Sequence, residues 1–297
     1  MTNSEQTGEL AKPFTTGDEL YQQRARKAFP ILVRQAIARK PIYYGDLAAE
    51  LKMPNARNLN FVLGSVGQAL IEKAQLTGET IPPITCLVLN QKTKLPSNGV
   101  AWFMPEHSIT KLSASEKRSV VDAQFQNIYA YREWETLLKE FSLPLAARDF
   151  KQQIKQARKG GYGSGGEGPE HKALKERVAN NPTLIGLPKT AAKGTTEHKL
   201  PSGDVVDVLF THKGQRVAVE IKSHISDEAD LTRGLFQCVK YEAVLKAEMA
   251  ADGLLQNVRV CLVTGQELPD SLVPLKTILG IETIYLPLAE PALTPIS

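Results

Sequence analysis

Several features are missing from this chain of 297 residues, and each absence argues against one kind of protein. Only three cysteines occur, Cys86, Cys238 and Cys261, and none has the C-x-x-C spacing of a zinc or redox motif. Their odd number also argues against a disulfide framework, so we expect a reducing environment. No run reaches the roughly 20 apolar residues that span a membrane, and the polar first twelve residues lack the apolar core of a signal peptide. We therefore expect a cytoplasmic protein without membrane contact.

The overall composition is that of a globular protein with a mildly basic balance. With 297 residues, of which 42% are hydrophobic, the chain is long enough for two domains. The formal net charge is +4 and the pI is about 8.8, which is compatible with nucleic-acid binding but not diagnostic of it. Composition alone therefore leaves the function open.

A glycine-rich stretch divides the chain. Residues 160–166 hold five glycines and one serine, a composition typical of a flexible linker. Four basic residues precede it, and no Gly-Lys-Ser or Gly-Lys-Thr follows, which argues against a phosphate-cradling loop. We predict a disordered tail over 1–16, a first domain over 17–150, a basic, glycine-rich linker over 151–168 and a second domain over 169–297.

The second domain is organised around a hairpin predicted between residues 200 and 222. Two valine-rich runs, 205–210 and 216–222, flank a His-Lys-Gly-Gln turn whose third residue is glycine. With Lys213 and Gly214 in the loop, counting outward places Asp207 opposite Glu220. Directly paired residues have Cβ atoms about 4.5–5.5 Å apart, and Lys222 shares the face of Glu220 because alternate residues do. Three ionisable side chains are therefore predicted on one side of the hairpin.

Charges in such an apolar setting need partners. Two carboxylates at this distance repel each other unless one holds a proton or a divalent cation lies between them. Carboxylate oxygens, the backbone carbonyl of Ile221 and water are ligands that Mg²⁺ or Mn²⁺ prefers. Lys222 would then orient or deprotonate a water, or neutralise charge that develops on a phosphate. The alternative is a surface hairpin with a simple Glu–Lys pair, which is a common pattern.

The sequence Glu220-Ile221-Lys222, thirteen residues after Asp207, resembles the D…ExK core of the PD-(D/E)XK, or restriction-endonuclease-like, nuclease superfamily. No proline precedes Asp207 or the alternative Asp204, and we prefer Asp207 because Asp204 would face residue 223. The resemblance implies an α-β-β-β-α-β core and a Mg²⁺ or Mn²⁺ ion held by Asp207, Glu220 and Ile221. The sequence offers matching elements at 170–179, 197–200, 205–210, 216–222, 230–250 and 258–264, followed by a helix at 272–279 and a strand at 282–286.

Two further features resemble elements of the same superfamily. Gln237 and Tyr241 are four residues apart on the predicted helix over 230–250, so they share a face. They match the Q-x-x-x-Y element that follows ExK in several branches and lies near the active site; the alternative is a half-exposed Gln beside a packing aromatic. Glu170 matches an acidic metal ligand on the first helix of some members, with Glu167 and Glu176 as competitors. The resemblance thus adds Glu170, Gln237 and Tyr241 to the catalytic candidates.

The first domain has the element order of a winged helix-turn-helix. We predict helices over 22–39, 47–51 and 56–74, a two-stranded wing over 84–89 and 100–103, and a long helix from Ser113 or Ser115 to about Phe141. In this mainly α-helical, winged-helix-like domain, DNA would be contacted near the start and outer face of the 56–74 helix. The candidates are Tyr44, Arg57, Asn58, Asn60 and Gln68. The alternative is an interaction module that touches no DNA.

The segment 41–103 also resembles the DNA-binding domain of the O6-alkylguanine DNA alkyltransferases. The likeness lies in Tyr-Gly-Asp-Leu-Ala at 44–48 and in Val-Gly-Gln-Ala-Leu at 66–70. The reactive Pro-Cys-His-Arg run of that family is replaced by Ile-Thr-Cys-Leu-Val at 84–88, and its base-displacing arginine by Ile71. We therefore expect no alkyl transfer, a core position for Cys86, and a DNA-docking shape.

These patterns predict a two-domain α/β protein that acts as a Mg²⁺-dependent DNA endonuclease in host defence or DNA repair. RNA as a substrate stays open, as does a homodimer or a partner subunit. Two alternatives remain: a non-catalytic nucleic-acid binder that retains the nuclease fold, and a protein-interaction or sensor subunit. Only the DNA-binding alternatives predict a steep fall of DNA affinity with salt.

Overall fold

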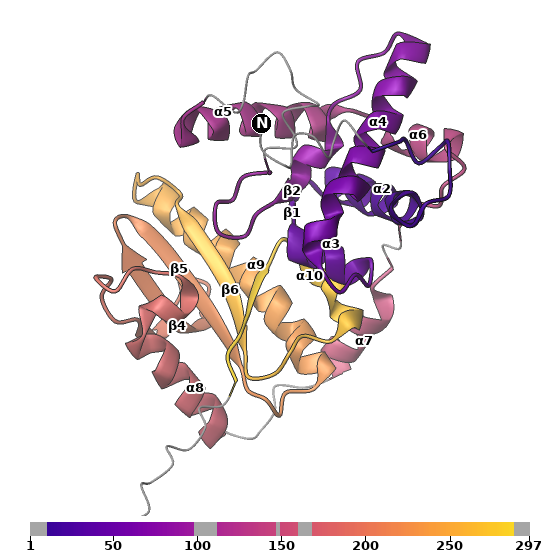
Figure 1. The fold of residues 1–297 in the computed structure, drawn as a ribbon. Helices are drawn as coiled ribbons and strands as arrows, with labels where there is room; N and C mark the ends of the chain where they lie inside the picture. Colours follow the sequence, from indigo (N-terminus) through magenta and orange to yellow (C-terminus); the bar gives the residue numbers. More distant parts are fainter. Residues whose placement is uncertain (1–10, 98–111, 147–148, 160–167, 288–297) are drawn as a thin grey trace, which may run out of the picture. The chain divides into compact units, whose positions relative to one another are not determined.

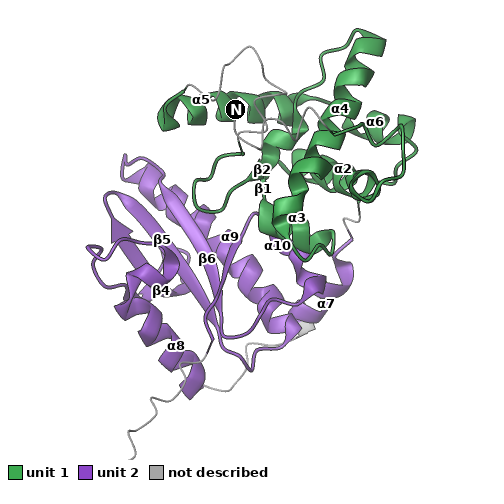
Figure 2. Ribbon diagram, viewed as in Figure 1, with its two compact units in different colours: residues 1–148 green, residues 149–297 purple. Residues whose placement is uncertain are grey.

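The computed structural model describes residues 11–97, 112–146, 149–159 and 168–287. The chain forms two compact units, residues 1–148 and residues 149–297, and each is described by itself (Figures 1 and 2). Helices occur together with a sheet of parallel and antiparallel strands, so the predicted α/β class is confirmed.

The first unit is mainly helical. Its described elements, in chain order, are α2 (Leu20–Ala38), β1 (Ile42–Tyr43), α3 (Tyr44–Glu50), the 3₁₀ turn Ala56–Asn58, α4 (Leu59–Thr77), the 3₁₀ turn Ile84–Leu87, β2 (Val88–Leu89), α5 (Ala114–Ala130) and α6 (Trp134–Glu140). Helix α4 packs against α2, and residues 62–67 of α4 are buried without interruption. A helix that is buried on every side is part of a core. Only the start and the end of α4 therefore have exposed faces.

The predicted tail and wing differ from the structure. Residues 11–16 are not a disordered tail, because Phe14 is 1% exposed and packs on Phe29 and Phe141 in the core. Residues 84–87 form a 3₁₀ turn instead of a strand, and the short strand β2 pairs in parallel with β1. The predicted returning strand at 100–103 lies outside the described residues. The wing is therefore not seen in the described part of the chain.

The predicted long helix over 113–141 is two helices. Ser113 caps α5 in a reciprocal box with Glu116, as its sequence indicates. Tyr131 is extended and ends α5, and α6 begins at Trp134. The Trp134 indole N–H donates to the carbonyl of Ile128 over 2.8 Å, and its ring is buried against Phe29. Burial of this large ring in the core stabilises the bend.

The second unit has the predicted order of elements. These are α7 (Lys151–Lys159), α8 (Pro169–Asn180), the 3₁₀ turn Pro182–Ile185, β3 (Thr195–Lys199), β4 (Val205–His212), β5 (Gln215–Lys222), α9 (Glu228–Ala251), β6 (Val258–Thr264), the 3₁₀ turn Asp270–Leu272, α10 (Val273–Leu279) and β7 (Glu282–Tyr285). The sheet order is β3-β4-β5-β6-β7, antiparallel from β3 to β5 and parallel from β5 to β7. From α8 to β6 the chain therefore runs α-β-β-β-α-β.

Strand β5 lies at the centre of the sheet and is buried on both faces. Val217, Val219 and Ile221 pack in the core on the α8 side, whereas Ala218 packs in the core on the α9 side. Side chains alternate along a strand, so Glu220 and Lys222 share the α9 side with Ala218. This alternation places two charged side chains inside an apolar layer.

The linker prediction differs from the structure in its first half. Residues 151–159 form α7, which packs against α9. Phe150 contacts the core on the α9 side and Ala157 is buried, whereas Lys155 is exposed. The glycine-rich residues 160–167 lie outside the described residues. The basic segment is therefore a docked helix of the second unit.

Candidate active site

The β4–β5 hairpin has the register expected from its turn. His212 pairs with Gln215, and the ladder continues to Val208 opposite Val219. The paired positions of the two strands end there, one step short of Asp207 and Glu220. The turn residues Lys213 and Gly214 have φ values of 47° and 77°, as a two-residue hairpin turn requires, and glycine adopts this conformation without strain.

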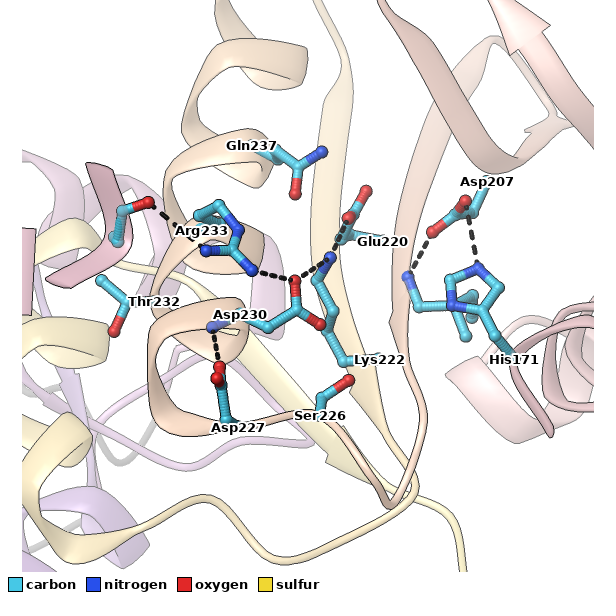
Figure 3. Close-up of polar contacts among 12 residues, drawn as sticks. His171, Asp207, Glu220, Lys222, Ser226, Asp227, Asp230, Thr232, Arg233 and Gln237 are labelled. Atoms are coloured by element: carbon cyan, nitrogen blue, oxygen red, sulfur yellow. Dashed lines mark hydrogen bonds and ion pairs between the residues drawn. The ribbon is translucent and has the colours of Figure 1, made fainter. Parts of the chain in front are cut away.

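Asp207 is fixed at the edge of this ladder. Its Oδ2 accepts a hydrogen bond from the backbone N–H of Ile221 over 2.7 Å, and its Oδ1 lies 3.5 Å from Nε2 of His171 on α8 (Figure 3). The Asp207 side chain keeps 19% of its surface exposed. This carboxylate is therefore oriented by the backbone of β5 while remaining accessible from outside.

Glu220 is the most strongly perturbed carboxyl of the group. It is 3% exposed, and burial, together with the nearby Asp207 charge, raises its pKa from 4.5 to about 7. Its Oε1 lies 3.1 Å from Nζ of Lys222, and its Oε2 lies 3.0 Å from the Tyr241 hydroxyl. That hydroxyl also lies 2.9 Å from the Val205 carbonyl, so its single hydrogen serves one acceptor at a time. Near neutral pH, Glu220 is therefore balanced between its charged and neutral forms.

Lys222 is the first member of a chain of charged contacts that continues along α9. Its Nζ lies 3.1 Å from Glu220 and 3.1 Å from Oδ1 of Asp230. The same Asp230 oxygen lies 3.1 Å from Arg233, whose Nη1 donates to the Ala157 carbonyl of α7 over 3.4 Å (Figure 3). Burial lowers the pKa of Lys222, but the two carboxylates raise it more, so the pKa is raised overall. Lys222 is therefore held as an ammonium ion.

A cleft opens beside these groups. It has a volume of about 580 Å³ and is lined by Gly168, His171, Lys175, Glu197, Val205, Asp207, Ser223, Ile225, Ser226, Asp227, Asp230 and Arg233. Both signs of charge line it, and Asp207 connects it to the buried pair Glu220 and Lys222 behind. The cleft thus gives a polar molecule access to one carboxylate of the site.

The carbonyl of Ile221 has an orientation consistent with its predicted role. The N–H of Gly265 donates to the Lys222 carbonyl, so the Lys222 carbonyl faces β6. Successive peptide groups of a strand point in opposite directions. The Ile221 carbonyl therefore points to the β4 side, where its own N–H binds Asp207. Among the described residues there is no group of three His, Cys, Asp or Glu side chains able to hold a metal, so a cation here would need this carbonyl or water.

The structure separates the remaining candidates of the second unit. Tyr241 contacts Glu220 directly. Gln237 Nε2 lies 3.4 Å from the Tyr241 hydroxyl, so Gln237 is linked to Glu220 through Tyr241. Glu170 is half-buried on α8 and is not among the residues that line the cleft, whereas the next residue, His171, is. The helix thus brings a histidine, not the predicted glutamate, to Asp207.

The DNA-contact candidates of the first unit are spread over two environments. Arg57 and Asn58 are exposed in the turn before α4, and Asn60 is half-buried in the first turn of α4. Tyr44 is half-buried, and its hydroxyl donates to Ser97 over 2.9 Å. Gln68 follows the buried centre of α4 and is half-buried. The first three therefore lie at or just before the start of α4, whereas Tyr44 begins α3 and Gln68 lies further along α4.

Three further residues of the site, His171, Asp230 and Arg233, are not among the site residues that the sequence predicts. Asp230 and Arg233 have the i, i+3 spacing of an ordinary helix pair, so the sequence gives no sign that Asp230 contacts Lys222 and that Arg233 contacts α7. His171 lay beside the favoured Glu170, and only the rotation of α8 distinguishes them.

Comparisons with models of known families, with curated proteins and with solved structures found no match to this chain. In the described part of the chain, every helix is too short or too polar to span a membrane.

Proposed function

We propose that this chain is a metal-dependent nuclease that hydrolyses phosphodiester bonds in DNA. The observation that carries the proposal is the convergence of Asp207, Glu220 and Lys222 on neighbouring strands beside an open cleft. The α-β-β-β-α-β order of the second unit and the position of Tyr241 against Glu220 support the same restriction-endonuclease-like interpretation. The proposed substrate class is DNA because the first unit resembles a DNA-docking domain.

The donor set fits a hard divalent cation. The Glu220 carboxylate is buried near a second carboxylate, Asp207, and these two causes raise its pKa. Asp207, Glu220 and the Ile221 carbonyl would hold Mg²⁺ or Mn²⁺, with water completing the shell. When bound, such an ion supplies an activated water and polarises the phosphodiester.

The protein's own groups would position the carboxylates and stabilise charge on the phosphate. The Ile221 N–H fixes Asp207, and the Tyr241 hydroxyl fixes Glu220. Because its pKa is raised, Lys222 is protonated at neutral pH and is better suited to stabilise charge on the phosphate than to accept a proton. Asp230 holds the ammonium group from the opposite side.

In this proposal the first unit positions DNA. The exposed Arg57 and Asn58 and the neighbouring Asn60 form a polar helix start of the kind that contacts phosphates and base edges. The buried centre of α4 argues against a helix that lies lengthwise in a groove, so we infer contact through its start. A role in host defence or DNA repair follows from the resemblance alone.

The test is cleavage of supercoiled plasmid and linear DNA with Mg²⁺, Mn²⁺ or EDTA. We expect metal-dependent nicking by the wild type that is lost in Asp207→Asn and in Lys222→Ala. The matched control is Asp204→Asn, since Asp204 lies on the same hairpin but pairs with Lys240 and Ser202. Nicking that survives in Asp207→Asn, or is lost equally in Asp204→Asn, would contradict the assignment.

One observation favours a second candidate, a nucleic-acid binder without catalysis. Both Glu220 oxygens already have partners, Lys222 and Tyr241, so the pair is satisfied without a metal. Salt-dependent DNA binding by a wild type that cuts with neither Mg²⁺ nor Mn²⁺ would support this candidate and reject the nuclease.

A further inference from the structure

Helix α7 is anchored to α9 along one side. Phe150, Ile154 and Ala157 follow the i, i+4, i+7 spacing that places residues on one side of a helix. Phe150 contacts the core on the α9 side, Ile154 is half-buried and Ala157 is buried. Arg233 of α9 donates to the carbonyl of Ala157. The outward side of α7 therefore has a fixed orientation within the second unit.

The stripe one residue further on is entirely basic. Lys151, Lys155 and Arg158 have the same i, i+4, i+7 spacing, and all three are exposed. We call these three residues the basic stripe. The helix contains no acidic residue, and Asp149, just before it, lies 3.7 Å from Lys151 with both side chains largely exposed. Like charges at i, i+4 destabilise a helix, so the stripe is an arrangement that an external polyanion would stabilise.

Helix α7, which carries the basic stripe, is linked to the cleft through Arg233. Arg233 contacts both Ala157 of α7 and Asp230, and Arg233, Asp230 and Asp207 all line the cleft. From Lys151 to Arg158 the stripe covers seven residue steps, about 10 Å along the helix axis. Phosphates of one DNA strand recur about every 3.4 Å along a duplex, so this length matches about three steps of a backbone that leaves the cleft.

We propose that the basic stripe of α7 is a docking surface for the phosphate backbone of the nucleic acid that enters the cleft. The second unit would then hold its own substrate, in addition to any contact by the first unit. An anionic membrane is the less suitable partner, because the apolar side of α7 is already covered by α9. The proposal rests on the proposed function for the identity of the ligand.

The experiment separates binding from cleavage. The full chain carrying Asp207→Asn is titrated onto a fluorescent 30-base-pair duplex in EDTA at several KCl concentrations. The test variant adds Lys151→Gln, Lys155→Gln and Arg158→Gln; the control instead adds Lys189→Gln, Lys193→Gln and Lys213→Gln, which remove the same charge from exposed positions of the same unit. Glutamine keeps the helix propensity of lysine, and circular dichroism confirms folding.

We expect the test variant to bind at least tenfold more weakly at low salt. Each lost phosphate contact reduces the salt slope by about 0.9, so three contacts reduce it by about 2.7. The control should stay within twofold of its parent, and a variant with Lys151→Arg, Lys155→Arg and Arg158→Lys should recover the slope.

Equal losses in test and control variants would overturn the proposal, as would an unchanged slope in the test variant. If the test variant keeps its DNA affinity but loses binding to phosphatidylserine vesicles, the stripe binds a membrane instead. Cleavage by the unmodified chain is measured separately. If the test variant has a reduced salt slope but the unmodified chain does not cleave DNA, the docking surface is supported and the proposed nuclease is rejected. If the unmodified chain cleaves DNA but the salt slope of the test variant is unchanged, only the docking surface is rejected.

Discussion

Replacing Glu220 by Gln tests the electrostatics of the site most directly. Glu220 is 3% exposed and its pKa is raised from 4.5 to about 7 by burial and by Asp207. A carboxyl whose folded pKa is above its unfolded value binds more protons when folded, so stability falls as pH rises between the two values. The metal-free wild type should therefore lose stability from about pH 4.5 to about pH 7 and stay at the lower level above that.

The magnitude follows from the pKa values. Each pKa unit corresponds to about 1.4 kcal/mol, so a rise from 4.5 to about 7 costs about 3 kcal/mol above pH 7. Glu220→Gln removes the charge and keeps an oxygen for Tyr241, while Lys222 retains Asp230. We expect the variant to be about 1–3 kcal/mol more stable than the wild type at pH 8 in EDTA, and about equal to it near pH 4.5.

The buried thiols give an assay specific to the second unit. Cys238 and Cys261 are buried in that unit, whereas Cys86 is buried in the first. Thiol labelling under native conditions, read peptide by peptide by mass spectrometry, measures the opening of each unit separately. Rates are corrected with urea-unfolded protein at the same pH, and Cys86 serves as the internal control because the substitution should leave it unchanged.

Metal addition completes this prediction. If Mg²⁺ binds at Glu220, an excess of 100 times its Kd should stabilise the wild type by about 2.7 kcal/mol at pH 8 and Glu220→Gln much less. The reasoning is refuted if the wild type shows the same protection at pH 5 and pH 8, or if the variant follows the wild-type profile.

Three other substitutions test separate parts of the structure. Tyr241→Phe removes the donor to Glu220 and should cost about 1.5–3 kcal/mol in the thiol assay and lower any nicking rate; unchanged protection would deny the hydrogen bond. Asp230→Asn should lower the pKa of Lys222 and so increase its acetylation by acetic anhydride at pH 8 several-fold, measured against other lysines of the chain; equal labelling would show that Asp230 does not hold the ammonium. Phe14→Ala should destabilise the first unit by about 3–5 kcal/mol in tryptophan-monitored unfolding, whereas a disordered tail would give no change.

The hairpin could be predicted because its signals are local. The two-residue turn fixes the register, and the period of two along each strand fixes which side chains share a face. The shared side of Glu220 and Lys222 on β5 follows from these rules, whereas the position of Asp207 also depends on its contacts with the Ile221 N–H and with His171. The sequence predicts the start of α5 at either Ser113 or Ser115, and the structure selects Ser113, which forms a capping box with Glu116.

Other predictions failed where helix rotation or distant packing decides the outcome. Successive helix residues point about 100° apart, so the rotation of α8 about its axis decides that His171 and not Glu170 faces Asp207. The segment around Phe14 is polar with few apolar residues, a composition typical of a disordered tail. In the structure the Phe14 ring nevertheless packs against Phe29. The basic segment 151–159 was assigned to a linker because its apolar positions are few.

The α/β order of the second unit and the turn-centred register of its hairpin are encoded locally, because turn chemistry and strand alternation act over short distances. Tertiary packing determines that Glu220 is desolvated, that Tyr241 contacts Glu220 and that Asp230 contacts Lys222. It also determines that α7 exposes its basic stripe. These features depend on how α8, α9 and α7 pack on the sheet. Packing is selected by the fit of whole surfaces, and no short sequence pattern encodes that fit.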